Sequence, residues 1–186
     1  MGLSISDLRP GISIKYNNEV FTILECEHAK LGRGSAFCRT KLKNLRTSQV
    51  IDCTLRDSDN IEEAFIEKRG LQYLYSDGDI FHFLDLETYE DLVLDKIRIE
   101  DKIEWLKDNL ELTGLFYNNE LINLELPSAL ELKVVETEPG FRGDTVKSGT
   151  KPAKLETGLI IQVPLFINKG DVIKVDTRTK EYLGRA

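Results

Sequence analysis

The sequence predicts an all-β protein built from three small antiparallel barrels. Apolar and polar residues alternate over short runs, and turn-forming residues recur between those runs. Helical spacing is confined to one short segment near 99–109, where Ile99, Ile103, Leu106 and Leu110 fall on one face. Many short strands with regular turns and little helix are typical of small barrels.

The N-terminal third predicts a hairpin followed by two more strands. Ile12, Ile14 and Tyr16 alternate with polar residues, and the Asn-Asn pair at 17–18 supplies a turn. Strands are expected at 12–16, 20–24, 36–42 and 50–55. Glycines 32 and 34 flank an arginine in the turn between the middle two, and glycine tolerates the positive φ that such a turn requires.

The rest of the chain repeats this pattern. Strands are expected at 71–75 and 80–84, at two sites within 112–126 on either side of the Asn-Asn pair at 118–119, and at 129–135, 159–163 and 172–175. The formal charge changes between segments: residues 1–64 carry 0, residues 65–127 carry −9, and residues 128–186 carry +2, which sum to −7. We therefore predict three domains with these boundaries.

Composition limits the function. No apolar run approaches a membrane span, and no secretory signal is present, so a cytoplasmic protein is expected. The cysteines at 26, 38 and 53 are odd in number and widely spaced, which predicts free buried thiols and neither a disulfide nor a metal site. His28 and His82 are the only two histidines, and His82, which alternates with Phe81 and Phe83, is expected on the surface of a strand. Because no catalytic motif is present either, we expect neither an enzyme nor a cofactor.

Residues 28–51 contain six cationic side chains and no Asp or Glu, in a chain of net charge −7. These are Lys30, Arg33, Arg39, Lys41, Lys43 and Arg46. The three from 39 to 43 alternate and should share one face of a strand with Phe37. Such a face attracts phosphate, and four phosphate contacts on single-stranded RNA would weaken binding about twentyfold for a threefold rise in salt. The alternative is an edge strand whose lysines only prevent aggregation.

Two long motifs resemble bacterial elongation factor P. The first is Lys30-Leu-Gly-Arg-Gly-Ser-Ala-Phe-Cys-Arg-Thr-Lys-Leu-Lys-Asn-Leu45, similar to that family's loop and strand. The second is Gly158-Leu-Ile-Ile-Gln-Val-Pro-Leu-Phe-Ile-Asn-Lys-Gly-Asp-Val-Ile-Lys-Val-Asp-Thr-Arg-Thr-Lys-Glu-Tyr182, similar to its C-terminal signature. The resemblance implies an N-terminal SH3-like (KOW-type) barrel followed by two OB-type barrels, in an L shape that mimics tRNA.

The resemblance also implies a function. Members of the family enter the 70S ribosome between the P and E sites when synthesis stalls at consecutive prolines. They contact rRNA and the P-site peptidyl-tRNA, position its CCA end and stimulate peptide-bond formation. We therefore expect a monomeric, non-enzymatic translation elongation factor with no membrane partner.

Individual residues take roles by the same resemblance. Arg33, with Gly32 and Gly34, occupies the tip that reaches the peptidyl-transferase centre, and Lys30 joins the cationic strand in binding RNA. Arginine replaces the lysine found at many family tips, which implies rhamnosylation of Arg33 by an arginine rhamnosyltransferase and no lysyl-type modification. The loop at Gly143, Asp144 and Thr145 matches one near the E-site codon, and Arg178 and Tyr182 belong to the C-terminal signature.

Two rival functions remain open on the sequence. An elongation factor P-like paralogue can also carry arginine at the tip, although the continuation Lys41-Leu-Lys-Asn-Leu45 favours the main family. A generic KOW/OB protein that binds RNA away from the ribosome would share the cationic strand. An enzyme is a distant third, since no residue pattern nominates a substrate.

Overall fold

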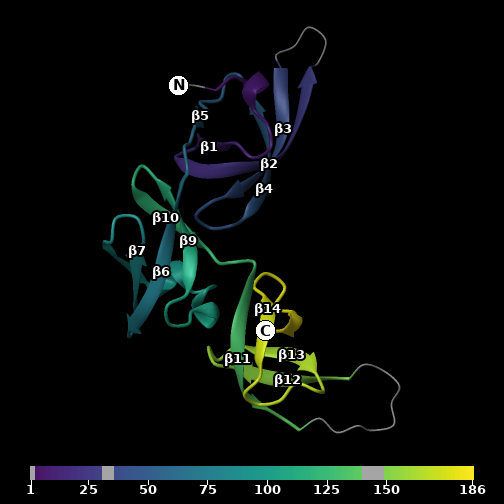
Figure 1. Cartoon of the computed structure of the whole chain (residues 1–186). Coiled ribbons are helices and arrows are strands. Elements are labelled where there is room, and N and C mark those ends of the chain that lie inside the picture. Colours follow the sequence, from purple (N-terminus) through teal and green to yellow (C-terminus); the bar gives the residue numbers. More distant parts are fainter. Residues whose placement is uncertain (1–2, 31–35, 140–148) are drawn as a thin grey trace. The chain divides into compact units, whose positions relative to one another are not determined.

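The computed structural model confirms the all-β class. It describes residues 3–30, 36–139 and 149–186, and contains three five-stranded sheets that follow one another along the chain (Figure 1). The tip residues at 32–34 and the loop residues at 143–145 lie outside the described residues. Within the part of the chain that is described, no helix is long and apolar enough to cross a membrane.

The first sheet has the strand order β4-β3-β2-β1-β5, and all its pairs are antiparallel. Its strands are β1 (Ser13–Tyr16), β2 (Glu19–Lys30), β3 (Ala36–Asn44), β4 (Val50–Arg56) and β5 (Glu62–Glu63). A short 3-10 helix, η1 (Ile5–Asp7), precedes them. The β2–β3 pairing is the longest in this sheet, and it brackets the tip segment.

The second sheet has the order β10-β9-β6-β7-β8. Its strands are β6 (Glu67–Asp77), β7 (Ile80–Asp85), β8 (Asp91–Asp95), β9 (Glu111–Tyr117) and β10 (Glu120–Glu125). The third sheet is antiparallel, with the order β13-β12-β11-β14-β15. Its strands are β11 (Ala129–Thr137), β12 (Thr150–Leu155), β13 (Ile160–Pro164), β14 (Val172–Asp176) and β15 (Tyr182–Arg185).

Paired asparagines form two of the tight hairpin turns, as predicted. Asn17 and Asn18 join β1 to β2 with φ of 50° and 64°, and Asn118 and Asn119 join β9 to β10 with φ of 51° and 63°. A two-residue turn with both φ values positive matches the right-handed twist of the strands it connects, and asparagine tolerates that conformation better than most residues.

Three longer turns, one in each sheet, share a single hydrogen-bonding pattern. We call them the 44–49, 85–90 and 176–181 turns. In each, the first side chain accepts backbone N–H bonds from the third and fourth residues at 2.8–3.1 Å. The fifth residue has a φ of about 60° and donates its N–H to the first residue's carbonyl. The first residues are Asn44, Asp85 and Asp176, and the fifth are Ser48, Tyr89 and Lys180.

The helix predicted near 99–109 forms two short segments instead of one helix. These are α1 (Lys96–Ile99) and the 3-10 helix η2 (Ile103–Trp105). A run of this length does not sustain a helix by itself, because nucleation is costly and few bonds follow it. Packing sets the outcome here: Trp105 is 2% exposed, and Leu106 leaves the segment in an extended conformation.

Contacts divide the described chain into two compact units that do not follow the three predicted domains. One unit is Met1–Lys68 with Gly114–Asn123, and the other is Arg69–Thr113 with Leu124–Ala186. Within the first unit, Leu45 packs with Leu115 and Ile122 from the β9–β10 hairpin. The domain boundaries at 64 and 127 therefore stay a prediction, although the sheets occupy residues 13–63, 67–125 and 129–185.

Candidate nucleic-acid interface

The outward face of β3 carries the predicted cationic residues. Along this strand Cys38, Thr40, Leu42 and Asn44 are buried, whereas the residues between them face outward. Arg39, Lys41 and Lys43 therefore share the outer face, as the alternation predicts. Phe37 lies on that face too, with the Arg39 guanidinium carbon 6.0 Å from its ring centre.

The edge-strand alternative is wrong. β3 pairs with β2 on one side and with β4 on the other, so its backbone hydrogen-bonding groups are used by neighbouring strands. A strand inside a sheet has no free edge for lysines to protect. The cations on its outer face therefore need another explanation, which carboxylates on the neighbouring strands or a bound anion can supply.

Acidic side chains lie across from these cations, which the sequence window 28–51 did not reveal. Glu25 is paired in register with Lys41, Glu27 with Arg39, and Asp52 with Lys41 from the other side. The Lys41 ammonium lies 3.0 Å from the Glu25 carboxylate. The hydrogen bond to Glu25 and the negative charge of Glu25 raise the pKa of Lys41 above its usual value, and Asp52 adds a smaller contribution. The face is therefore a mixed cross-strand array and not a one-signed patch.

Lys30 is the last residue of β2 and pairs with Ala36, so it stands directly before the tip segment. The predicted tip residue Arg33, with Gly32 and Gly34, falls outside the described residues, as does the loop at 143–145. The β2–β3 hairpin is the element that would present the tip, since its two strands end on either side of residues 31–35.

Arg178 and Tyr182 lie at the end of the third sheet. Arg178 is the third residue of the 176–181 turn, and its side chain is 80% exposed. Tyr182 begins β15, and its pairing with Val175 closes the hairpin. Backbone N–H groups of Thr179, then of Arg178, donate to the Asp176 carboxylate and lower its pKa, with a lesser contribution from the Arg178 guanidinium.

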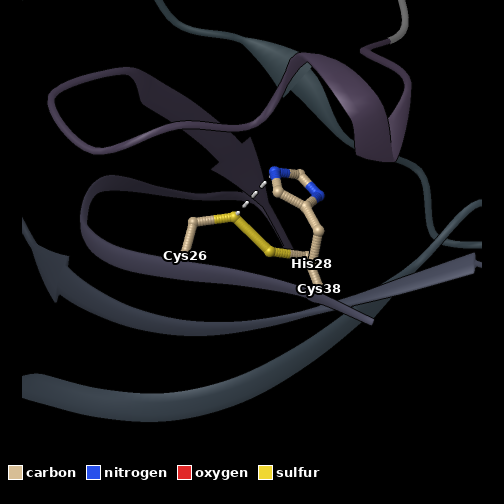
Figure 2. Close-up of side chains that lie close together, drawn as sticks. All are labelled: Cys26, His28 and Cys38. Carbon is tan, nitrogen blue, oxygen red and sulfur yellow. Dashed lines mark hydrogen bonds between the residues drawn. A yellow bond between two sulfur atoms is a disulfide. The ribbon is translucent and has the colours of Figure 1, made fainter. Parts of the chain in front are cut away.

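The cysteine prediction is wrong. Cys26 and Cys38 form a disulfide, and Cys53 is the free thiol (Figure 2). The cause is strand register: His28 pairs with Cys38 while Cys26 pairs with Thr40, so the two cysteines are diagonal neighbours. Sequence spacing alone does not show this, because the strands meet only after the chain has reversed.

His82 lies on β7, as predicted for a strand-surface histidine. Its Nδ1 is 3.2 Å from the Asp91 carboxylate, and its ring stacks on Tyr75 with centroids 4.5 Å apart. Asp91 lies on the neighbouring strand β8, and Tyr75 lies on β6 opposite His82. His82 thus has a packing role in the second sheet.

The described chain forms three successive five-stranded β-sheets, an all-β architecture of small sheet domains. Two solved structures share this fold over 68% of the chain. Eukaryotic translation initiation factor 5A from Methanococcus jannaschii aligns with a TM-score of 0.52 at 21% identity, covering 68% of this chain and 92% of that one. An eif-5a family protein from Naegleria fowleri aligns with a TM-score of 0.53 at 14% identity, covering 68% and 98%.

Sequence comparisons identify the family. Residues 4–61 match "Elongation factor P (EF-P) KOW-like domain", residues 66–124 match "Elongation factor P (EF-P) OB domain", and residues 130–185 match "Elongation factor P, C-terminal". Elongation factor P of Moorella thermoacetica is 54% identical over 99% of this chain and 100% of its own length. That of a Thermoanaerobacter species is 51% identical over 98% and 99%. The chain belongs to the elongation factor P family and is a translation elongation factor.

Proposed function

We propose that this protein binds the ribosome between the P and E sites, positions the CCA end of the P-site tRNA and restores peptide-bond formation at proline-rich stalls. The main support is the full-length relationship to elongation factor P, at 54% identity over 99% of the chain. The β2–β3 hairpin agrees with it, because its outer face holds cations directly beside the tip segment. The factor acts as a cytoplasmic monomer with three domains, at 1–64, 65–127 and 128–186.

The proposed activity requires positioning and no catalytic group. Proline has a ring-locked φ and a secondary amine, so the donor and acceptor of a proline peptide bond align poorly. Holding reactants in a productive geometry lowers an entropic barrier by up to about 7–11 kcal/mol in favourable systems. Relief of a stall needs only part of that amount.

Each predicted site residue has a place in this proposal. Arg33, flanked by Gly32 and Gly34, approaches the CCA end, while Arg39, Lys41 and Lys43 hold tRNA or rRNA phosphates from the outer face of β3. Lys30 extends that set to the base of the tip. Gly143, Asp144 and Thr145 contact the small subunit near the E-site codon. Arg178 and Tyr182 belong to the C-terminal signature, at the 176–181 turn and the start of β15.

Rescue of a proline-run reporter tests the proposal. In a translation system depleted of the endogenous factor, Arg33→Ala should abolish the stimulation of a Pro-Pro-Pro reporter and leave a proline-free reporter unchanged. Arg98→Ala is the matched control, because Arg98 is an exposed arginine in α1 and is not one of the predicted site residues. Full rescue by the Arg33 variant would show that the tip side chain is not the acting group.

The salt bridge on β3 permits a second test that concerns RNA binding alone. Glu25→Gln frees the Lys41 ammonium from its 3.0 Å partner, so it should tighten binding to tRNA. Lys41→Ala should weaken binding and lower the salt slope by about 0.7. Arg39→Ala should do the same. Unaltered affinity and slope in all three variants would remove β3 from the interface.

The tip modification is open to a direct measurement. Arginine cannot accept a β-lysyl group on an amine, so we propose that an arginine rhamnosyltransferase attaches rhamnose to Arg33. Intact-mass analysis of the native protein, followed by fragmentation of the tip peptide, should place one deoxyhexose on Arg33. A tip peptide of unshifted mass from the native host would reject the modification and leave the ribosomal proposal standing.

A further inference from the structure

Cys26, His28 and Cys38 form the group of metal-ligand side chains that stands out in the described chain. One ligand atom from each residue lies within 4.8 Å of the other two, and no other set of three or more such residues does so among the described residues. Figure 2 shows the imidazole of His28 turned toward the Cys26 sulfur, which is bonded to the Cys38 sulfur. Neither the family relationship nor the proposed ribosomal function uses this cluster.

Strand geometry places these ligands together. Cys26 and His28 are two residues apart on β2, so their side chains leave the same face of the strand, and Cys38 is the cross-strand partner of His28. Cys38 is fully buried, Cys26 is half-buried and His28 is exposed. The cluster thus has a dry inner wall and an accessible outer side.

The distances fit a tetrahedral zinc site once the disulfide is reduced. With zinc–sulfur bonds of about 2.3 Å and zinc–nitrogen bonds of about 2.05 Å, the sulfur–nitrogen edge of a tetrahedron is about 3.6 Å. The Cys26 Sγ to His28 Nε2 distance is 3.6 Å. Two thiolates on one zinc ion stand about 3.8 Å apart, a separation that two unbonded sulfurs can adopt. Reduction must therefore separate the two sulfurs, while the Cys26–His28 distance in the disulfide form already matches an edge of such a site.

A fourth oxygen ligand is at hand. The carbonyl oxygen of Leu8 lies 3.0 Å from His28 Nε2, which donates to it, and 3.6 Å from Cys26 Sγ. This oxygen is therefore a candidate for the fourth position of a zinc ion held by the three side chains. Either that carbonyl or a water on the exposed side of His28 can complete four-coordination.

We propose that the reduced form of this protein binds one Zn²⁺ through Cys26, Cys38 and His28, and that the disulfide form does not. A dithiol reductant transfers two electrons and two protons, so the Cys26–Cys38 bond breaks as the reductant closes its own disulfide. Zinc then displaces both thiol protons, and the His28 proton moves to Nδ1 so that Nε2 can ligate. A disulfide oxidant reverses the sequence: it accepts two electrons and two protons to become two thiols as the Cys26–Cys38 bond forms, and the ion is released. Zinc binding at this hairpin therefore depends on redox state.

Metal titration of the full chain tests this proposal. The protein is reduced with a phosphine, which takes oxygen from water as both thiols form, and is titrated with Zn²⁺ against a chromophoric chelator. The reduced wild type should bind one equivalent, and the oxidised wild type none. With Co²⁺ in place of Zn²⁺, the reduced protein should show thiolate charge-transfer absorption and the intense d–d bands of a tetrahedral site. Absence of binding by the reduced protein, or equal binding by both forms, would overturn the site.

Variants separate the ligands from the third cysteine. Cys38→Ser and His28→Gln should each weaken zinc binding by at least about tenfold. Cys53→Ser is the matched control and should bind like the wild type, because Cys53 is not among the clustered ligands. Since Cys38 is fully buried, its variant could lose folding, but His28 is exposed and its variant keeps the test decisive. Wild-type affinity in His28→Gln, or a loss in Cys53→Ser equal to that in Cys38→Ser, would refute the assignment.

Discussion

The 85–90 and 176–181 turns have the same backbone but different surroundings. Both begin with an aspartate that accepts two backbone N–H bonds, and both have a fifth residue with φ near 60°. The side chain of Asp85 is 2% exposed and lies 3.8 Å from Arg69, whereas that of Asp176 is 17% exposed. The first side chain of one turn is therefore buried, and that of the other is partly exposed.

The difference shows which positions set the turn and which remain variable. The first residue supplies the acceptor, the fourth is threonine in all three turns, and the third donates its backbone N–H to that acceptor whatever its side chain. That third residue is Glu87 in the acidic central region, Arg46 in the first sheet and Arg178 in the third. The charge of this side chain can therefore change without altering the turn. Arg178 is an example: its side chain is 80% exposed, while its backbone N–H keeps the hydrogen bond of the turn.

The largest effect should come from Asp85→Ala. This change removes the acceptor of two backbone N–H groups and a buried carboxylate beside Arg69, and should destabilise the fold by about 3 kcal/mol. Denaturant unfolding followed by Trp105 fluorescence reports on it, because Trp105 is the single tryptophan and lies in the same compact unit.

Asp85→Asn is the control for that experiment. The asparagine amide keeps an oxygen that accepts the N–H groups of Glu87 and Thr88, although the charge is gone. The free energy of unfolding should therefore fall less than in Asp85→Ala. Asp176→Ala should lower stability least, since water can replace the carboxylate there. Equal losses from Asp85→Ala and Asp176→Ala would mean that burial does not distinguish the two turns.

An intermediate effect is expected at the 44–49 turn, where the first residue is neutral. Asn44 is 6% exposed, and its amide donates to the Glu19 carboxylate at 2.8 Å. Asn44→Asp keeps the turn acceptor but sets two carboxylates against each other, which should cost about 2 kcal/mol at neutral pH. Amide hydrogen exchange along β3 measures this loss.

The pH dependence of the Asn44→Asp variant identifies the cause. Protonation of the carboxylate pair removes the repulsion, so the loss should be present at neutral pH and shrink as the pH falls. Combining Asn44→Asp with Glu19→Gln should restore most of the stability, because the glutamine amide can donate where Asn44 did. If the double variant stayed as unstable as Asn44→Asp at every pH, the cause would be packing and not charge.

The turns also show which parts of the fold the sequence predicts and which it does not. Alternation located most strands, and the asparagine pairs located two hairpin turns. β12 was missed because Pro152 and small residues obscure its pattern of buried Lys151, Ala153 and Leu155. The repeated motif of Asn or Asp first, Thr fourth, and Glu or Gln sixth was legible at 44–49, 85–90 and 176–181, and a search for repeats would have found it.

Site residues divide in the same way. Period-two alternation correctly put Arg39, Lys41 and Lys43 on one face, because that inference uses one strand only. The acids opposite them and the Cys26–Cys38 pair depend on the register between strands. Register is set by turn geometry and by the whole hydrophobic pattern of the sheet, so a window along one strand does not contain it.

The smallest expected effect concerns the titration of Asp176. Its pKa is lowered mainly by backbone N–H groups of Thr179 and Arg178, so Arg178→Ala should move it little and leave the turn intact. A carboxylate with a depressed folded pKa contributes stability above its unfolded pKa of about 3.9, and that contribution is lost as the pH falls through the folded value. Protection factors of the amides in the 176–181 turn, which are corrected for the intrinsic pH dependence of exchange, should therefore fall only under acid, in wild type and Arg178→Ala alike. If the Arg178→Ala variant instead returned the Asp176 pKa, followed by carboxyl NMR, to the ordinary aspartate value, the guanidinium would be what holds this turn, and its third position would not be free to vary.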